Sequence, residues 1–204
     1  HAKQLSTDNL SMRQNYQNTI MQKILLLTII SILIFHIGHS QNSADSVDFP
    51  RSWEGIYKGE LEIFSGSGKV QTLPMELHIL PNDTSDIRWS WTIIYGEDKE
   101  AGKRAYELIE KDKSKGHYVV DEKNTIYLDG FLLGGKFFER FEVMGSLLMT
   151  STEKVSEDEL LWEIISGKLE PINTTGGEKF EGEDIPSVGS YGINVLQRAR
   201  LKKN

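Results

Sequence analysis

The chain has 204 residues, with 23 Lys and Arg against 30 Asp and Glu, and its net charge is −7. This acidic balance disfavours nucleic acid and anionic membrane surfaces as partners, because both require basic patches. The chain has no Cys, which excludes disulfides and a lipid anchor on Cys, and its length suits one domain with a core of its own.

The N-terminal part does not have the pattern of a folded domain. Residues 1–20 are polar and lack an apolar period, so we expect an upstream segment that is non-native or disordered. Residues 21–40 combine Lys23, an apolar run from Ile24 to Ile34, and a small-residue site before Gln41. These are the parts of a secretory signal peptide.

A transmembrane anchor is the alternative for residues 21–40. The apolar run is shorter than the roughly 20 residues that a helix needs to cross a bilayer, so a signal peptide is favoured. We therefore expect an exported protein, periplasmic or extracellular, without a stable membrane anchor. Residues 41–52 are expected to form a polar leader.

From Trp53 onward, short runs of alternating apolar and polar residues are separated by clusters of Gly, Asn, Asp and Lys. This spacing is typical of all-β proteins. The clearest run is 87–95, where every second residue is large and apolar, as suits a half-buried pleated surface. The predicted strands are 55–64, 70–80, 87–95, 104–112, 117–122, 125–131, 136–143, 147–154, 159–167 and 190–201. The segments 96–103 and 170–187 are predicted to be loops.

The strand pattern also predicts an architecture. Each run keeps one polar face, unlike the doubly buried strands of a parallel sheet, and no helical crossover separates the runs. A flat sheet of about ten strands would leave two long edges, which closure removes. We expect residues 53–201 to form a single all-β domain, an antiparallel up-and-down meander of about ten strands in a closed or nearly closed barrel. A two-layer β-sandwich is the alternative.

The two ends of this domain carry a resemblance. The first strand opens with Trp53-x-Gly55-x-Tyr57, and the last contains Arg198-x-Arg200. This resembles the calycin superfamily of lipocalins, fatty-acid-binding proteins and nitrobindin-like proteins, in which a Trp before the first strand packs under an Arg from the last. The resemblance implies a structural contact between Trp53 and Arg198, with Arg200 as the alternative partner.

No metal, cofactor or catalytic site is expected. His78 and His117 lie on different predicted strands, and a zinc site needs three or four ligands. The resemblance supplies no haem ligand, since no His follows His117, and no Gly-x-Ser-x-Gly elbow is present. The chain is therefore expected not to be an enzyme.

Two acidic residues do not follow the solvated pattern. Glu122 and Glu139 fall on apolar strand faces, and a buried carboxylate must be paired or neutral. In an enzyme, either one could serve as the acid or base. The alternative is a bulge or strand end that turns them outward.

Large aromatic side chains fall on the predicted inner faces, where a closed barrel would bring them together. Buried Tyr and Trp need polar partners, and a barrel of about eight strands has room for one small ligand. The favoured function is an exported, soluble protein that binds a small, mostly apolar molecule. A plain packed core is the alternative, in a cell-envelope structural or protein-interaction module whose partners contact loops 96–103 and 170–187. The candidate ligand-binding residues are Tyr57, Trp89, Trp91, Tyr95, Tyr106, Tyr118, Glu139, Phe141 and Trp162.

Overall fold

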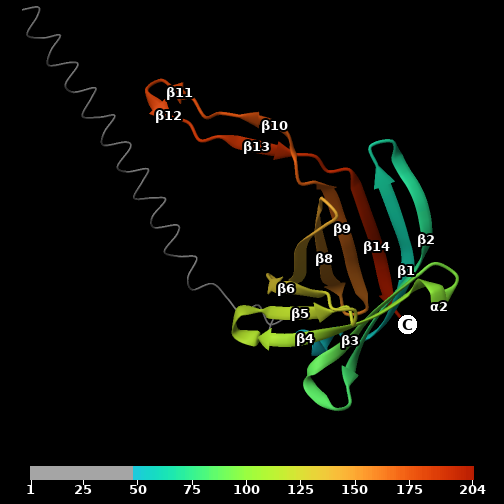
Figure 1. Ribbon diagram of the computed structural model, residues 1–204. Helices are drawn as coiled ribbons and strands as arrows, with labels where there is room; N and C mark the ends of the chain where they lie inside the picture. The colour runs from blue at the N-terminus through green and yellow to red at the C-terminus, as the bar shows by residue number, and fades with distance from the viewer. Residues whose placement is uncertain (1–47) are drawn as a thin grey trace, which may run out of the picture. The chain divides into compact units, whose positions relative to one another are not determined.

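The computed structural model describes residues 48–204, which form a closed antiparallel barrel of ten strands (Figure 1). The order around the barrel is β1-β14-β9-β8-β7-β6-β5-β4-β3-β2, so the first and last strands are neighbours. This confirms the predicted meander, and the sandwich alternative is wrong. The expected upstream segment 1–20, the signal peptide 21–40 and residues 41–47 of the leader lie outside the described residues.

The predicted strands match the observed ones closely. The run 136–143 has the bounds of β7 itself, and the other runs up to residue 167 differ from their strands by a few residues at the ends. The barrel strands are β1 (Gly55–Ser65), β2 (Gly68–Asn82), β3 (Ser85–Tyr95), β4 (Lys103–Asp112), β5 (His117–Asp121), β6 (Tyr127–Leu133), β7 (Lys136–Val143), β8 (Ser146–Ser156), β9 (Glu159–Lys168) and β14 (Val195–Lys203).

Three short helices lie in the described part of the chain. They are η3 (Arg51–Trp53), α2 (Lys99–Gly102) and η4 (Lys113–Lys115). The helix α2 occupies half of the segment predicted as loop 96–103, and Asp98 caps it by accepting hydrogen bonds from the amides of Glu100 and Ala101. None of the described helices has the length and apolar character to cross a membrane.

A tightly packed floor closes one end of the barrel. Phe49 is only 1% exposed, and its ring centroid lies 4.7 Å from that of Trp53, 4.9 Å from Tyr118 and 5.3 Å from Phe137. The hydroxyl of Tyr118 donates to the Phe49 carbonyl, and that of Tyr57 to the Trp53 carbonyl, each at 3.0 Å. The core therefore includes Phe49, although the sequence interpretation assigned this residue to the polar leader.

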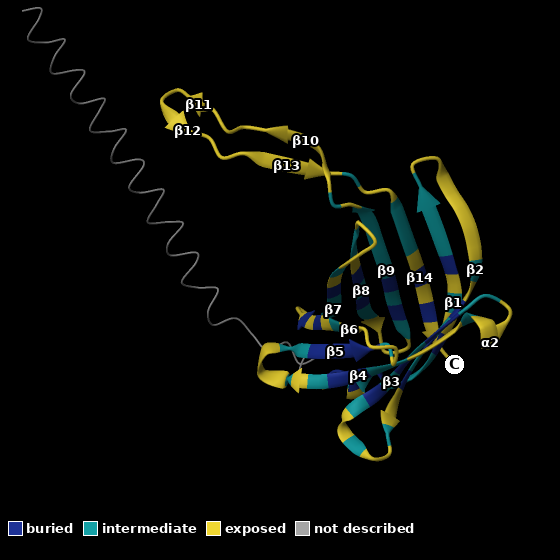
Figure 2. Ribbon diagram, in the orientation of Figure 1, coloured by how far each residue is buried: buried dark blue, intermediate teal, exposed yellow. Residues whose placement is uncertain are grey.

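The segment 170–187 is not the predicted loop. It belongs to a hairpin in which β10 (Pro171–Thr175) pairs with β13 (Val188–Tyr191), and β11 (Lys179–Phe180) pairs with β12 (Glu183–Asp184) beyond them. We call residues 170–191 the arm. Every one of its residues is exposed (Figure 2), so Gly, Pro and acidic residues, which resemble a loop in sequence, here build a two-stranded ladder without a core.

The arm also divides the last predicted strand. The run 190–201 separates into the end of β13 and the barrel strand β14, with Gly192 between them. The amide of Asn194 donates to the Ser166 carbonyl at 2.8 Å, so the chain rejoins the barrel beside the end of β9. The apolar alternation across this junction predicted one continuous strand and gave no sign of the break.

The expected contact between Trp53 and Arg198 is wrong. Arg198 lies opposite Glu62 in the register of β14 on β1, with its guanidinium carbon 5.6 Å from the centroid of the Phe64 ring. The residue of β14 that lies opposite Tyr57, near the floor, is Lys203. The strands are neighbours as the resemblance implied, but Arg198 stands about half a strand away from the floor.

Candidate functional site

The two ends of the barrel differ in how they are covered. In an up-and-down meander alternate connections lie at the same end, so the connections 66–67, 96–102, 122–126 and 144–145 and the arm mark the end opposite the floor. The inward-facing apolar residues toward this end are only partly buried, in contrast to the fully buried rings of the floor (Figure 2). We call it the open end. Its partly buried apolar residues are Ile63, Leu73, Tyr95, Tyr106, Leu128 and Ile164.

Four of the predicted ligand-binding residues belong to the floor and its surrounding core. Tyr57, Trp89, Trp91 and Tyr118 are almost fully buried. Three of their polar atoms have protein partners, since both tyrosines donate to backbone carbonyls and the Trp89 indole donates to Glu54 at 2.9 Å. These side chains therefore pack and fix the floor.

The remaining polar candidates gather toward the open end. Tyr95, Tyr106 and Glu139 lie close enough to interact electrostatically with one another. Arg104 acts on the two tyrosines, and Glu122 acts on Tyr106 and Glu139. We call these five residues the mouth cluster. They come from β3, β4, β7 and the β5–β6 connection, so only barrel closure brings them together.

The two tyrosines of the mouth cluster differ from those of the floor. Neither Tyr95 nor Tyr106 has a hydrogen-bond partner for its hydroxyl among the described residues. Burial raises the pKa of both phenols, and the nearby charge of Glu139 raises it further while Arg104 opposes the change. Both therefore stay neutral at physiological pH, with a hydroxyl free to donate or accept a hydrogen bond.

Glu139 is the buried acid of the site. Its side chain faces the barrel interior on β7, it is 9% exposed, and its Oε2 accepts a hydrogen bond from the Thr150 hydroxyl at 2.7 Å. Burial raises the pKa of Glu139 to about 7, the Thr150 bond opposes this shift, and the charge of Glu122 adds to it. The expectation that Glu139 points inward is confirmed, and the outward alternative is wrong for this residue.

Aromatic rings lie beside these polar groups. The Tyr95 ring centroid lies 6.4 Å from that of Trp162 at an interplanar angle of 62°, a contact between β3 and β9 from different sides of the barrel. Phe141 lies half-buried two residues beyond Glu139, opposite Leu148 of β8. Trp162 and Phe141 therefore join the open half of the barrel.

Sequence reasoning missed Arg104 and Thr150. Thr150 pairs with Glu139 in the β7–β8 register, a relation that depends on strand register and leaves no mark in either strand alone. Arg104 begins a predicted run, and its Nη1 donates to the Ala101 and Lys103 carbonyls at 3.2 and 2.9 Å. Arg104 lies opposite Ile93, an inward-facing residue of β3, and this pairing could have indicated that Arg104 belongs to the site.

The two histidines of the described chain take no part in this site. Nε2 of His78 lies 2.8 Å from Glu76, and Nε2 of His117 lies 2.7 Å from Asp129. Within residues 48–204, no group of three or more His, Cys, Asp or Glu side chains is placed to hold a metal ion.

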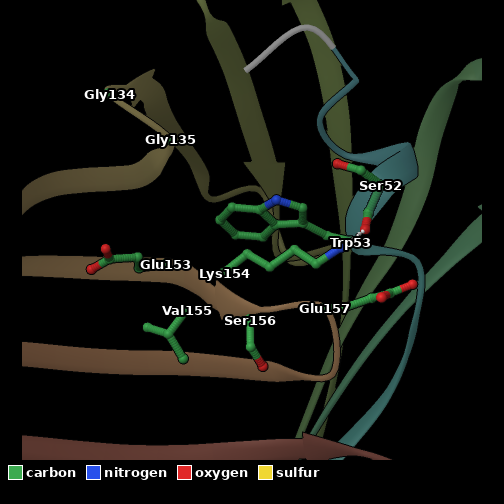
Figure 3. Close-up of a pocket in the computed structure, with 9 residues that line it drawn as sticks. All are labelled: Ser52, Trp53, Gly134, Gly135, Glu153, Lys154, Val155, Ser156 and Glu157. Carbon is green, nitrogen blue, oxygen red and sulfur yellow. Dashed lines mark hydrogen bonds between the residues drawn. The ribbon is translucent and has the colours of Figure 1, made fainter. Parts of the chain in front are cut away.

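A cleft of about 460 Å³ lies at the floor end, outside the barrel (Figure 3). Lys154 reaches past the Trp53 ring there, and its ammonium donates to the Ser52 carbonyl at 2.6 Å. The cation near Trp53 is therefore Lys154 of β8, and Arg200, the alternative partner that the resemblance implied, donates to Glu159 instead. The cleft is lined by Ser52, Trp53, Gly134, Gly135, Glu153, Lys154, Val155, Ser156 and Glu157.

No family model and no curated protein matches this chain. Among solved structures, it is similar to a protein of unknown function from the DUF3598 family of Nostoc punctiforme, with a TM-score of 0.52 and 11% identity over 75% of this chain. The chain spans about half the length of that protein, 48%.

A second similar structure is the S-type phycobiliprotein lyase CPES from Guillardia theta, with a TM-score of 0.51 and 10% identity. The match covers 81% of this chain and 98% of the lyase. At 11% and 10% identity, both likenesses concern the fold alone.

Proposed function

We propose that this protein binds a small, mostly apolar molecule in the open half of the barrel. The observation that carries the proposal is the contrast between the two pairs of tyrosines. The hydroxyls of Tyr57 and Tyr118 donate hydrogen bonds to backbone carbonyls of the floor. Those of Tyr95 and Tyr106 have no hydrogen-bond partner among the described residues and lie near the buried acid Glu139. Convergent polar groups within apolar walls are typical of a ligand site.

The packing of the floor limits where such a ligand can lie. Because the floor rings contact one another across the barrel, the ligand would occupy only the half lined by partly buried residues such as Ile63, Leu73 and Leu128. These residues would contact the apolar body of the ligand, and the mouth cluster would orient its polar end.

Binding without catalysis is the form of the proposal that we favour. One structural neighbour is a phycobiliprotein lyase, and Glu139 has a pKa suited to acid–base chemistry. However, the hydroxyl next to Glu139 is that of Thr150, and no third group among the described residues hydrogen-bonds to this pair to orient it for catalysis. Native mass spectrometry of protein from its own host would identify the bound molecule, and a chemically altered product among the bound species would contradict a pure binding role. The accompanying ligand screen includes linear tetrapyrroles, the chromophores of phycobiliproteins.

A substitution that fills the open end tests the site. Leu128→Trp places a large ring on the inward face of β6. We expect the affinity for a fluorescent lipid probe to fall by about tenfold or more, with the fold retained. Tyr127→Trp is the matched control, because Tyr127 is the preceding residue and points outward. Equal probe affinity in both variants would place the ligand elsewhere or show that there is none.

We propose further that the protein is exported, with cleavage before Gln41. The support is the basic start, the short apolar run and the small residues of segment 21–40. Sequencing the N-terminus of the product recovered outside the cytoplasm tests this, and an uncleaved chain in the membrane fraction would contradict it.

A second candidate function is protein interaction through the arm. Ile172 and Phe180 of the arm are 77% and 66% exposed, which is unusual for large apolar residues. Replacing residues 171–191 with a short glycine linker should leave probe binding unchanged under the first proposal. If the same change instead alters association with a partner while no ligand is ever found, the interaction function is favoured.

A further inference from the structure

Glu139 has hydrogen-bonding capacity that the fold does not use. Thr150 satisfies its Oε2, and among the described residues no group pairs with its Oε1. A carboxylate has room for about four hydrogen bonds, and a buried one is costly unless paired. The unpaired Oε1 keeps some contact with solvent, and burial raises the pKa of the carboxyl to about 7. A cationic ligand group at Oε1 would stabilise the ionised form.

Aromatic rings of the same region can also hold a cation. Tyr95 and Trp162 meet at an angle, and Tyr106 lies within the electrostatic reach of both Tyr95 and Glu139. Aromatic faces attract ammonium groups, and the attraction increases where water is excluded. Rings combined with a carboxylate are the usual chemistry for recognising amines.

The charges around the mouth cluster also favour a positively charged ligand. Glu122 adds a second carboxylate from the β5–β6 connection, and the chain as a whole carries −7. Arg104 is the opposing charge, but it is exposed and its Nη1 donates to the carbonyls of Ala101 and Lys103. An acidic protein attracts cations over long range, which raises their association rate.

We propose that the ligand of the open end carries a basic nitrogen, which pairs with Glu139 among the rings of Tyr95, Tyr106 and Trp162 while its apolar body lies against the barrel wall. This inference rests on the proposed binding function and names the class of its ligand: an amphiphilic or aromatic amine.

The pairing makes binding depend on pH. The groups that act on Glu139 are Thr150 from β8, Glu122 from the β5–β6 connection, and Tyr95 and Tyr106 from β3 and β4, and the charge of Arg104 acts on the same two phenols. Because the ammonium pairs with the ionised carboxylate, binding removes a proton from Glu139 below its pKa of about 7. Amine affinity should therefore rise about tenfold between about pH 6 and about pH 8, where an aliphatic amine remains charged.

Three probes with one tail separate the head groups: octylamine, octanol and octanoate, each titrated by calorimetry into the cleaved protein at about pH 8. We expect octylamine to bind at least about tenfold more tightly than the other two. Tightest binding of octanoate would overturn the amine assignment and make Arg104 the head-group partner, while the binding function would stand. Equal affinities for the three probes would also overturn the amine assignment. If none of the probes binds, the binding function itself is refuted.

The variant Glu139→Gln keeps the side-chain shape and an oxygen for Thr150. We expect it to lose the preference for octylamine over octanol and the pH dependence, while octanol affinity stays the same. The matched control is Glu142→Gln, because Glu142 lies on the same strand but is exposed. Loss of the preference in the control alone, or retention of it in Glu139→Gln, would contradict the assignment. The probe comparison on the unmodified protein needs no variant to fold.

Discussion

Replacing Phe49 with alanine is expected to lower the free energy of unfolding by about 3–5 kcal/mol, because the change removes a fully buried ring from a packed core. The ring contacts three other aromatic side chains from η3, β5 and β7, so no single neighbour can move to fill the space. Its backbone carbonyl also accepts the Tyr118 hydroxyl, which would lose a well-placed partner if the segment shifted. Urea denaturation followed by tryptophan fluorescence measures the change.

The matched control is Phe180→Ala, the same substitution in the arm, where the ring is exposed. We expect that change to lie within about 0.5 kcal/mol of the unmodified protein. A similar small effect for Phe49→Ala would mean that the floor is stable without its aromatic plug. In that case, the floor and not the open end would have to be reconsidered as a place for ligands.

The sequence predicted the barrel because barrel strands repeat a local pattern. In β3, large apolar residues alternate without interruption, and turn residues mark both ends, so local information was sufficient. The arm was missed for the opposite reason. Its strands bury nothing and therefore have no alternation, and the turn at Glu181-Gly182 is held by backbone conformation, with positive φ at both residues.

The site was predicted only as far as one strand can indicate it. Tyr95, Tyr106 and Glu139 were found because each lies on the apolar face of its own strand. Thr150 and Arg104 belong to the same region through strand register and closure, which no single strand encodes. Phe49 was missed because one apolar residue in a polar segment has no period, and the contact proposed for Arg198 was wrong because resemblance at the two chain ends did not fix the register.

The stability of this protein is expected to fall as pH rises from about 4.5 to about 7, in the part that depends on Glu139. The sign follows from the direction of the pKa shift. Glu139 has a pKa of about 7 in the folded protein against 4.5 ordinarily, so the folded state holds the proton more tightly. Below the lower value both states are protonated and there is no cost. Above the higher value the folded protein carries a buried carboxylate, at a cost of about 3 kcal/mol.

The variant Glu139→Gln removes this cost because it cannot ionise. Its free energy of unfolding, relative to the unmodified protein, should therefore rise by about 3 kcal/mol between about pH 4 and about pH 8, and should level off above that range. Urea denaturation at a series of pH values measures the difference. Glu142→Gln, from the exposed face of β7, should give a flat difference over the same range. A flat difference for Glu139→Gln as well would mean that the Glu139 carboxyl titrates as in water. Water would then solvate the Glu139 carboxylate at the open end, and a cationic ligand would gain little by pairing with it.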